Sequence, residues 1–575
     1  SLRHVVVHPP GHVPPMKALL CACGALLVAH PSRVAASLAF STVQHRSRLH
    51  SRVHAALDLE GPAELLPAKE VQSNAELGFA SMTALLRCSC ALSAQYIIVQ
   101  TLLIIVGFAQ GKAEKSGFHL ALMSARTVMQ TGPTLCVLFL AAQMQAMQFS
   151  HGSQDPAPWI QICMQVATVA LIGESLLAVF APLFLGFTPE VDEDMPLVSG
   201  PFSWTRVASS TFLLATCGSC AGVCVGILSM RRTEELVPQS RGVSPAVICT
   251  VNLALQYFAV HMLLTVTTIC LKTGQHRSSK VFQVLRLALR TVFFAPMLGV
   301  LFIAARVRAL QVDRLDGQPQ PWAQAAFHVC NGAILGQMAL VSIVPFLPGG
   351  DVKQGTALAE SDVEIAFVGF EHGMVRLVLE LLRYLPCALL GGGISAVVAS
   401  ILTFTSTSGP TPPLPPTMQC ALLLACIFFA VYIGLWVLGA VREVAHGRRG
   451  RGSHLAAALD LLRAASETAR VCPVLAVLFV SVRLRAQQIT GHTGAPQGWA
   501  QDAMYICTIA TFLRLLATFL PETRLPALQK SIAVSQVILS LIMCGGAIIV
   551  LIAMLTMTPE TAGGSGAHIT ASVAA

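Results

Sequence analysis

The stretch PVLAVLFVSVRLRAQQITGHTGAPQGWAQ, residues 473–501, decides the fold, because the chain contains two variants of it. Pro133 and Pro296 begin the other two copies, and in each copy an apolar run ends in paired amide or basic residues. A tryptophan follows each proline after 26 residues: Trp159, Trp322 and Trp499. Repetition at a constant offset indicates an internal repeat.

The composition predicts a multi-pass integral membrane protein. Hydrophobic residues make up 54% of the 575 residues and charged residues only 11%, whereas soluble domains carry about 25% charged residues. Apolar runs of about 20 residues, long enough to cross a bilayer, recur along the chain. The net charge of +9 comes from Lys and Arg that gather in loops, which favours contact with anionic lipids. No nucleic-acid motif is present, so the lipid bilayer is the expected partner and nucleic acid is not.

The repeated prolines predict an all-α fold with about 12 transmembrane helices in three parallel four-helix repeats. An even number of helices per repeat lets successive units enter the membrane from the same side. The second helix of each unit is expected to be one span that the proline starts or kinks. These second helices are expected at residues 127–148, 282–308 and 470–488.

The repeats divide the chain into six expected segments. They are a targeting segment (1–57), an N-terminal segment outside the membrane (58–89), three transmembrane repeats (90–240, 241–410 and 411–557) and a disordered tail (558–575). Residues 373–385, which mix apolar and charged side chains, are expected to form a surface helix before the last span of the second repeat.

The N-terminal segment has the composition of a targeting sequence. Residues 16–29 have the charged start and short apolar core of a secretory signal peptide, and 37–39 offer small residues for cleavage. The Arg- and Ser-rich stretch that follows, 40–57, has no acidic residue. This combination resembles the two-part plastid presequence of algae with complex plastids, while a plain secretory signal explains it equally well. A secretory-pathway or plasma membrane and a complex-plastid membrane therefore both stay open.

Three polar residues fall at equivalent depth inside the third helices. Glu174, Gln337 and Arg514 each stand 15 residues after the tryptophan. Ionisable groups at that depth are costly and usually face a partner or a water-filled cavity. We therefore predict an ion pair between Glu174 and Arg514, with Gln337 bonding to either. The pair would act as a structural lock or as part of a transport site.

Further polar residues form stripes on the first and third helices. Those on the third helices are Gln165, His328, Asn331, Tyr505 and Thr508, and those on the first helices are Gln100, His261 and Tyr432. Such stripes can line an aqueous path. They can equally form hydrogen bonds that hold helices together.

Two arginine pairs lie near the ends of the second helices. Arg306 and Arg308 in the second unit and Arg483 and Arg485 in the third are expected to form a basic rim at the membrane interface, where long side chains reach the headgroups. The alternative is a guanidinium site for an anion or an acidic lipid headgroup.

No familiar catalytic motif occurs in the chain. Phosphate-binding loops, H-E-x-x-H, G-x-S-x-G and clustered Cys/His metal spacings are all missing from the sequence. We therefore expect no catalytic, cofactor or metal site, and no enzyme. Two hypotheses stay open: a transporter or channel for a small solute, and a non-transporting structural or assembly protein of a membrane or membrane complex.

Overall fold

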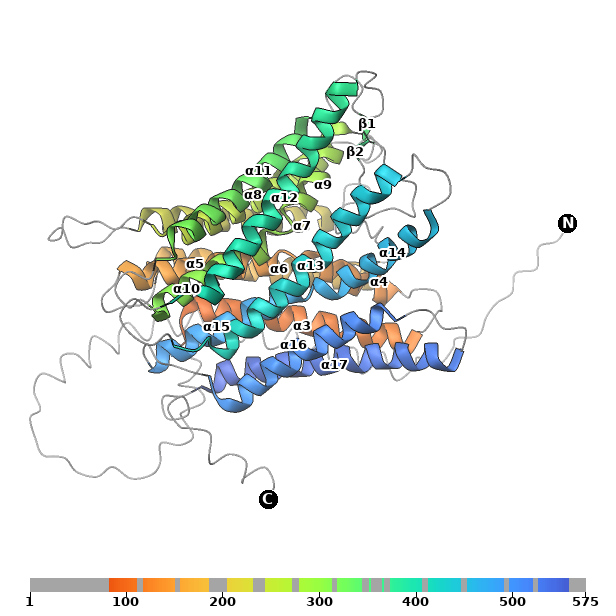
Figure 1. Cartoon of the computed structure of the whole chain (residues 1–575). Helices are drawn as coiled ribbons and strands as arrows, with labels where there is room; N and C mark the ends of the chain where they lie inside the picture. Colours follow the sequence, from red (N-terminus) through yellow and green to blue (C-terminus); the bar gives the residue numbers. More distant parts are fainter. Residues whose placement is uncertain are drawn as a thin grey trace, which may run out of the picture. The chain divides into compact units, whose positions relative to one another are not determined.

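The computed structural model describes residues 82–110, 117–149, 156–185, 204–230, 243–270, 279–312, 318–343, 351–352, 365–366, 373–405, 412–445, 452–490, 496–520 and 526–557. These residues are almost entirely helical (Figure 1). The expected targeting segment at 1–57 and the expected tail at 558–575 lie outside the described residues.

The helices follow one another in a recurring order of lengths. They are α3 (Ala84–Gln110), α4 (Gly117–Met129), α5 (Gly132–Phe149), α6 (Pro158–Leu185), α7 (Trp204–Ser229), α8 (Pro245–Cys270), α9 (Lys280–Val292), α10 (Ala295–Val312), α11 (Pro321–Ile343), α12 (Gly373–Thr403), α13 (Pro416–Ala445), α14 (Gly452–Ala469), α15 (Cys472–Thr490), α16 (Gly498–Thr518) and α17 (Pro526–Thr556). Two short strands, β1 (Asp351–Val352) and β2 (Ile365–Ala366), form an antiparallel pair.

The chain is a multi-pass membrane protein. Within the described residues, 10 helical segments are long and apolar enough to cross a membrane. The expected total of 12 is not established, because neither α16 nor the α4–α5 pair is among the ten. Gln501, Asp502 and Arg514 make α16 less apolar than its neighbours.

The second helix of each expected unit is broken rather than continuous. The prolines Pro133, Pro296 and Pro473 are each the second residue of a new helix, which we call the proline helices: α5, α10 and α15. A short helix precedes each one: α4, α9 and α14. Proline has no N–H to donate and its ring collides with the carbonyl four residues earlier, so the preceding helix ends. A single tight turn bridges the break, as where Phe293 N donates to Arg290 O at 3.4 Å.

The proline helices form the centre of the helical region. Each of the three contacts the other two, and nearly every residue of α10 is buried. Phe139, Phe302 and Phe479, at equivalent positions, are completely buried. The middle of the bundle is therefore filled with side chains.

The helices that begin near the tryptophans pack away from this centre. We call α6, α11 and α16 the tryptophan helices; their main partners are α7, α12 and α17 (Figure 1). Each begins with the same hydrogen bond, from a glutamine amide to a proline carbonyl in the preceding loop. The pairs are Gln161 and Pro156 (2.8 Å), Gln324 and Pro319 (2.7 Å), and Gln501 and Pro496 (2.7 Å).

Two expected boundaries differ from the structure. Helix α3 starts at Ala84, so its first turn lies in the segment predicted to be outside the membrane. The surface helix expected at 373–385 is not separate, because α12 runs without a break from Gly373 through Pro386 to Thr403.

Candidate functional site

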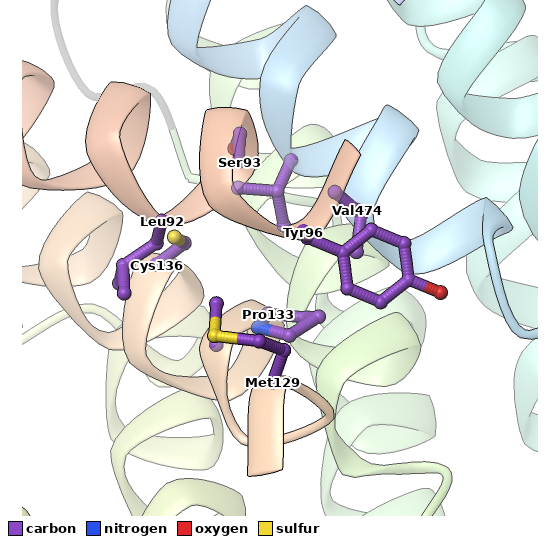
Figure 2. Close-up of a pocket in the computed structure, with 9 residues that line it drawn as sticks. Leu92, Ser93, Tyr96, Met129, Pro133, Cys136 and Val474 are labelled. Carbon is purple, nitrogen blue, oxygen red and sulfur yellow. The ribbon is translucent and has the colours of Figure 1, made fainter. Parts of the chain in front are cut away.

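A small cavity lies where the first helix break meets α3 and α15 (Figure 2). Ser93 and Tyr96 of α3 line it together with Gly132 and Pro133 at the start of α5. Val474, in the first turn of α15, lines it too, so two proline helices begin at this cavity. Its volume of about 10 Å³ holds roughly one water molecule. Because Tyr96 lies near the middle of the 27-residue α3, the cavity lies near the middle of a span.

An ion pair links the first and third parts of the chain near this cavity. Arg126 Nη2, on α4, lies 2.8 Å from Glu467 Oε2, on α14. Arg470, in the turn after α14, places Nη1 3.3 Å from Glu467 Oε1. Each carboxylate oxygen therefore faces a different guanidinium. Tyr96 lies within electrostatic range of Arg126, Arg470 and Glu467, which connects these charges to the cavity.

A third guanidinium completes the group. Arg514, on α16, lies within electrostatic range of Arg126 and Glu467. Its Nη1 atom is buried and has no hydrogen-bond partner among the described residues. We call Arg126, Glu467, Arg470 and Arg514 the ion cluster. It contains three positive side chains and one negative side chain, a formal excess of two positive charges.

The ion cluster is only partly enclosed by protein. The side chains of Arg126 and Arg470 are 21% and 24% exposed, and that of Glu467 is 42% exposed. Charged groups at the depth of mid-span are unstable against lipid hydrocarbon and face water or a partner. We infer that water or a ligand reaches the ion cluster on the side of Glu467.

The predicted ion pair between Glu174 and Arg514 does not form. Glu174 Oε1 accepts a hydrogen bond from Ser209 Oγ at 3.3 Å, while Arg514 lies in the ion cluster. Gln337 is half-buried on α11. The prediction failed because these three residues lie on the tryptophan helices, which pack mainly against α7, α12 and α17. The proline helices occupy the centre where the three would have met.

The four arginines of the predicted basic rim are buried against other parts of the protein. The exposed fractions of Arg306, Arg308, Arg483 and Arg485 are 3%, 4%, 6% and 2%. Two of them make equivalent contacts: Arg308 Nη1 donates to Gln311 Oε1 and Arg485 Nη1 to Gln488 Oε1, both at 2.9 Å.

Part of the predicted polar stripe forms hydrogen bonds between helices. Asn331 accepts a bond from Gln256 Nε2 at 3.0 Å and donates one to the carbonyl of Cys249 at 3.2 Å, which ties α11 to α8. Tyr505 donates to Gln419 Oε1 at 3.2 Å, which ties α16 to α13.

The remaining stripe residues lie in different contacts, and one of them, Tyr432, lies within electrostatic range of Arg470 and Glu467 in the ion cluster. Thr508 bonds within its own helix, to the carbonyl of Met504. His328 is exposed with Nδ1 3.6 Å from Cys249 Sγ. His261 lies 4.8 Å from Tyr257 between ring centroids, and Tyr432 lies 4.7 Å from Phe428. Gln165 is half-buried and Gln100 is buried.

Sequence reasoning missed most of the ion cluster. Of its four residues only Arg514 was predicted to matter. A signal was present, because Arg126, Glu467 and Arg470 fall within seven residues before Pro133 or Pro473 in an otherwise apolar context. Charges directly before a helix-breaking proline are the pattern that identifies them.

The described residues contain no group of three His, Cys, Asp or Glu side chains that could hold a metal ion. No protein-family model matches the chain, and no curated protein matches it.

Proposed function

We propose that this multi-pass membrane protein is a transporter or channel for a small solute, with a path that passes the ion cluster. The observation that carries the proposal is the position of the ion cluster. Arg126, Glu467 and Arg470 lie beside two helix breaks and are partly exposed, and Glu467 and Arg470 lie near the middle of the span Leu455–Ile489. Arg514 of α16 lies within electrostatic range of Arg126 and Glu467. Intramembrane charges are expensive, and they commonly mark solute or ion pathways.

The broken helices support the same proposal. A break inside the membrane leaves helix ends and irregular backbone at a depth where water is scarce. Such breaks are tolerated where protein or a water-filled cavity surrounds them. In many transporters, discontinuous helices form the substrate site, with the positive ends of half-helices directed toward it. Here the first turns of α5 and α15 meet one cavity lined by Tyr96, which lies within electrostatic range of Arg126, Arg470 and Glu467.

We further infer a ring of three parallel units, each containing one proline helix. Three observations support it. The same glutamine-to-proline bond occurs three times. The proline helices touch one another. Helices α7 and α8, α12 and α13, and α17 and α3 also contact one another, which would close the ring from the third unit back to the first.

A structural or assembly protein is the second candidate, and the close packing of the outer helix pairs favours it. A Cβ added at Gly546 of α17 would lie 2.6 Å from Cys507 Sγ of α16, which indicates tight contact. In this case the Arg126–Glu467 pair would only tie the first and third units together.

Flux through liposomes separates the two candidates. We would reconstitute the purified full chain and follow entry of acetate, choline and glycerol, which are an anion, a cation and a neutral solute. A transporter should give protein-dependent flux of at least one of them, reduced in Arg514→Gln. Folded protein that passes none of the three would favour the structural candidate.

Thiol labelling tests the hydrated opening independently. In an otherwise cysteine-free chain, Glu467→Cys should react with a membrane-impermeant thiol reagent from one side only. Leu478→Cys, at a completely buried position of α15, is the control that should stay unlabelled. Protection of both positions would contradict a water-filled approach to the ion cluster.

A further inference from the structure

We propose that the ion cluster is a binding site for a small oxyanion, and that the carboxylate of Glu467 occupies this site in the present structure. The inference deepens the transport proposal by naming the class of solute. It rests on that proposal only for the claim that the bound anion is transported. Binding itself can be tested without transport.

The contacts of Glu467 define the ligand chemistry. One carboxylate oxygen lies 2.8 Å from a guanidinium nitrogen of Arg126, and the other lies 3.3 Å from one of Arg470. Two arginines from distant parts of the chain thus hold two oxygens of one planar group. Guanidinium groups suit carboxylates and phosphates because their N–H donors form a rigid fork. Any small anion with two oxygens on one atom can make the same two contacts.

The ion cluster has an excess of positive charge that a bound anion would reduce. Two arginines contact the single carboxylate and Arg514 lies within electrostatic range of it, so Glu467 neutralises only part of the positive charge. Arg514 has a buried Nη1 atom without a hydrogen-bond partner among the described residues. A buried charged donor without a hydrogen-bond partner destabilises the folded state, and a bound oxyanion that accepts this hydrogen bond would remove the cost.

The helix ends near the ion cluster carry partial charges of both signs. Gly132 and Pro133 begin α5, and Val474 lies in the first turn of α15, and all three line the cavity beside Tyr96. The N-terminal ends of helices carry a partial positive charge that stabilises anions. Each of these positive ends faces the negative C-terminal end of α4 or α14, where Arg126 and Glu467 lie, so the positive charge of the ion cluster comes from its arginines.

Among the residues of the ion cluster, Glu467 has the side chain that can most easily move away from the arginines. Its side chain is 42% exposed, about twice the fraction of Arg126 or Arg470. It can therefore move outward without opening the packed centre, while the arginines stay to receive a ligand. The two guanidinium groups now hold one carboxylate, so they suit a ligand of similar size, in the range of nitrate, acetate or inorganic phosphate.

Thermal unfolding of the purified full chain in detergent tests binding directly. A ligand that binds the folded state raises the unfolding temperature in a concentration-dependent way. We expect nitrate, acetate and phosphate to stabilise the protein more than chloride at matched ionic strength. Equal stabilisation by chloride would overturn the oxyanion assignment. Stabilisation by added phosphatidylglycerol in place of the free anions would overturn the assignment to a soluble ligand.

Substitutions separate a binding site from a structural ion pair. In Glu467→Gln the internal competitor is gone, so half-maximal stabilisation should occur at a concentration lower by about tenfold or more. Arg126→Gln and Arg514→Gln should raise that concentration by a similar factor, and Arg514→Lys should restore part of the effect. Arg463→Gln is the matched control, because Arg463 lies on α14 but pairs with Asp460 at 2.8 Å. We expect no change in that variant.

The outcomes distinguish the two proposals. If Glu467→Gln folds and does not bind oxyanions more tightly, or if Arg463→Gln weakens binding as much as Arg514→Gln, the oxyanion site is wrong. If liposomes then still pass choline or glycerol, transport stands and only the solute class fails. If the protein binds oxyanions but liposomes show no flux, the proposal of an oxyanion site stands and the proposal of transport is wrong.

Discussion

Gly393 of α12 packs against Cys330 of α11 so closely that an added Cβ would lie 2.5 Å from the sulfur. The carbonyl oxygen of Ala326 would lie 3.3 Å from the same Cβ. The equivalent pair in the third part of the chain, Gly546 and Cys507, has nearly the same geometry, with 2.6 Å to the sulfur. The helix backbones thus approach closely in two of the outer pairs, α11–α12 and α16–α17. Such close approach is common where small residues mediate helix packing in membranes.

Gly393→Ala should therefore destabilise the protein by about 1–3 kcal/mol, the usual cost of overpacking a close contact. Gly392→Ala is the matched control, since nothing lies within 4 Å of its added Cβ. Alanine favours a helix over glycine by up to about 1 kcal/mol, so the control should be neutral or slightly stabilising. Unfolding of both variants in detergent measures the difference. Equal stability of the two variants would contradict the close approach.

Phe294→Ala should cost about 3–5 kcal/mol, the range for removing a buried aromatic ring. Phe294 lies in the break between α9 and α10 and packs against rings of α13, including Trp436 at 4.7 Å and Tyr432 at 5.4 Å between centroids. Phe512→Ala is the control, because Phe512 is 46% exposed on α16. The thermal midpoints should separate the two variants clearly. Similar midpoints would show that the aromatic contact contributes little.

Asn331 and Gln256 should be energetically coupled. Their hydrogen bond of 3.0 Å ties α11 to α8, and bonds of this kind in membrane proteins contribute about 0.6 kcal/mol on average. A double-mutant cycle with Asn331→Leu and Gln256→Leu measures the coupling. Zero coupling would favour the alternative in which these residues line an aqueous path.

Glu174 and Arg514 should show no coupling, because they lie in different contacts. Arg126 and Glu467 should couple by about 0.5–3 kcal/mol, the range for residues in direct contact. Cycles with Glu174→Gln and Arg514→Gln, and with Arg126→Gln and Glu467→Gln, make the comparison in the same protein. A strong coupling between Glu174 and Arg514 would show that the pairing inferred from sequence spacing is right after all.

The length of the apolar runs predicted well where helices occur, because a bilayer admits few alternatives to a helix. It did not predict whether each helix is continuous or broken. The apolar run that contains Pro296 continues on both sides of it, from Val292 to Ile303, so hydropathy alone predicts a single span. The break follows from the backbone chemistry of proline, and only the packed neighbours decide whether a proline kinks a helix or ends it.

The candidate site was predicted poorly for a different reason. Equivalent spacing placed Glu174 and Arg514 at the same depth, but depth does not determine which helices meet. The proline helices reach the centre because their first ten residues are apolar on almost every side, and this excludes the tryptophan helices from it. Likewise, the burial of Arg308 and Arg485 depends on neighbours that spacing does not reveal.

The single carboxylate of the ion cluster has an evolutionary consequence. A ring of three identical separate subunits would present every charge three times, so one glutamate among three arginines could not arise there. Thr127 and Arg290 each lie six residues before a repeated proline, as Glu467 does. They are therefore its equivalents in the first and second of the proposed units. Joining the units in one polypeptide lets each position mutate alone. In the three-unit ring proposed above, fusion of duplicated segments would permit a lopsided site that a symmetric trimer of separate subunits could not contain.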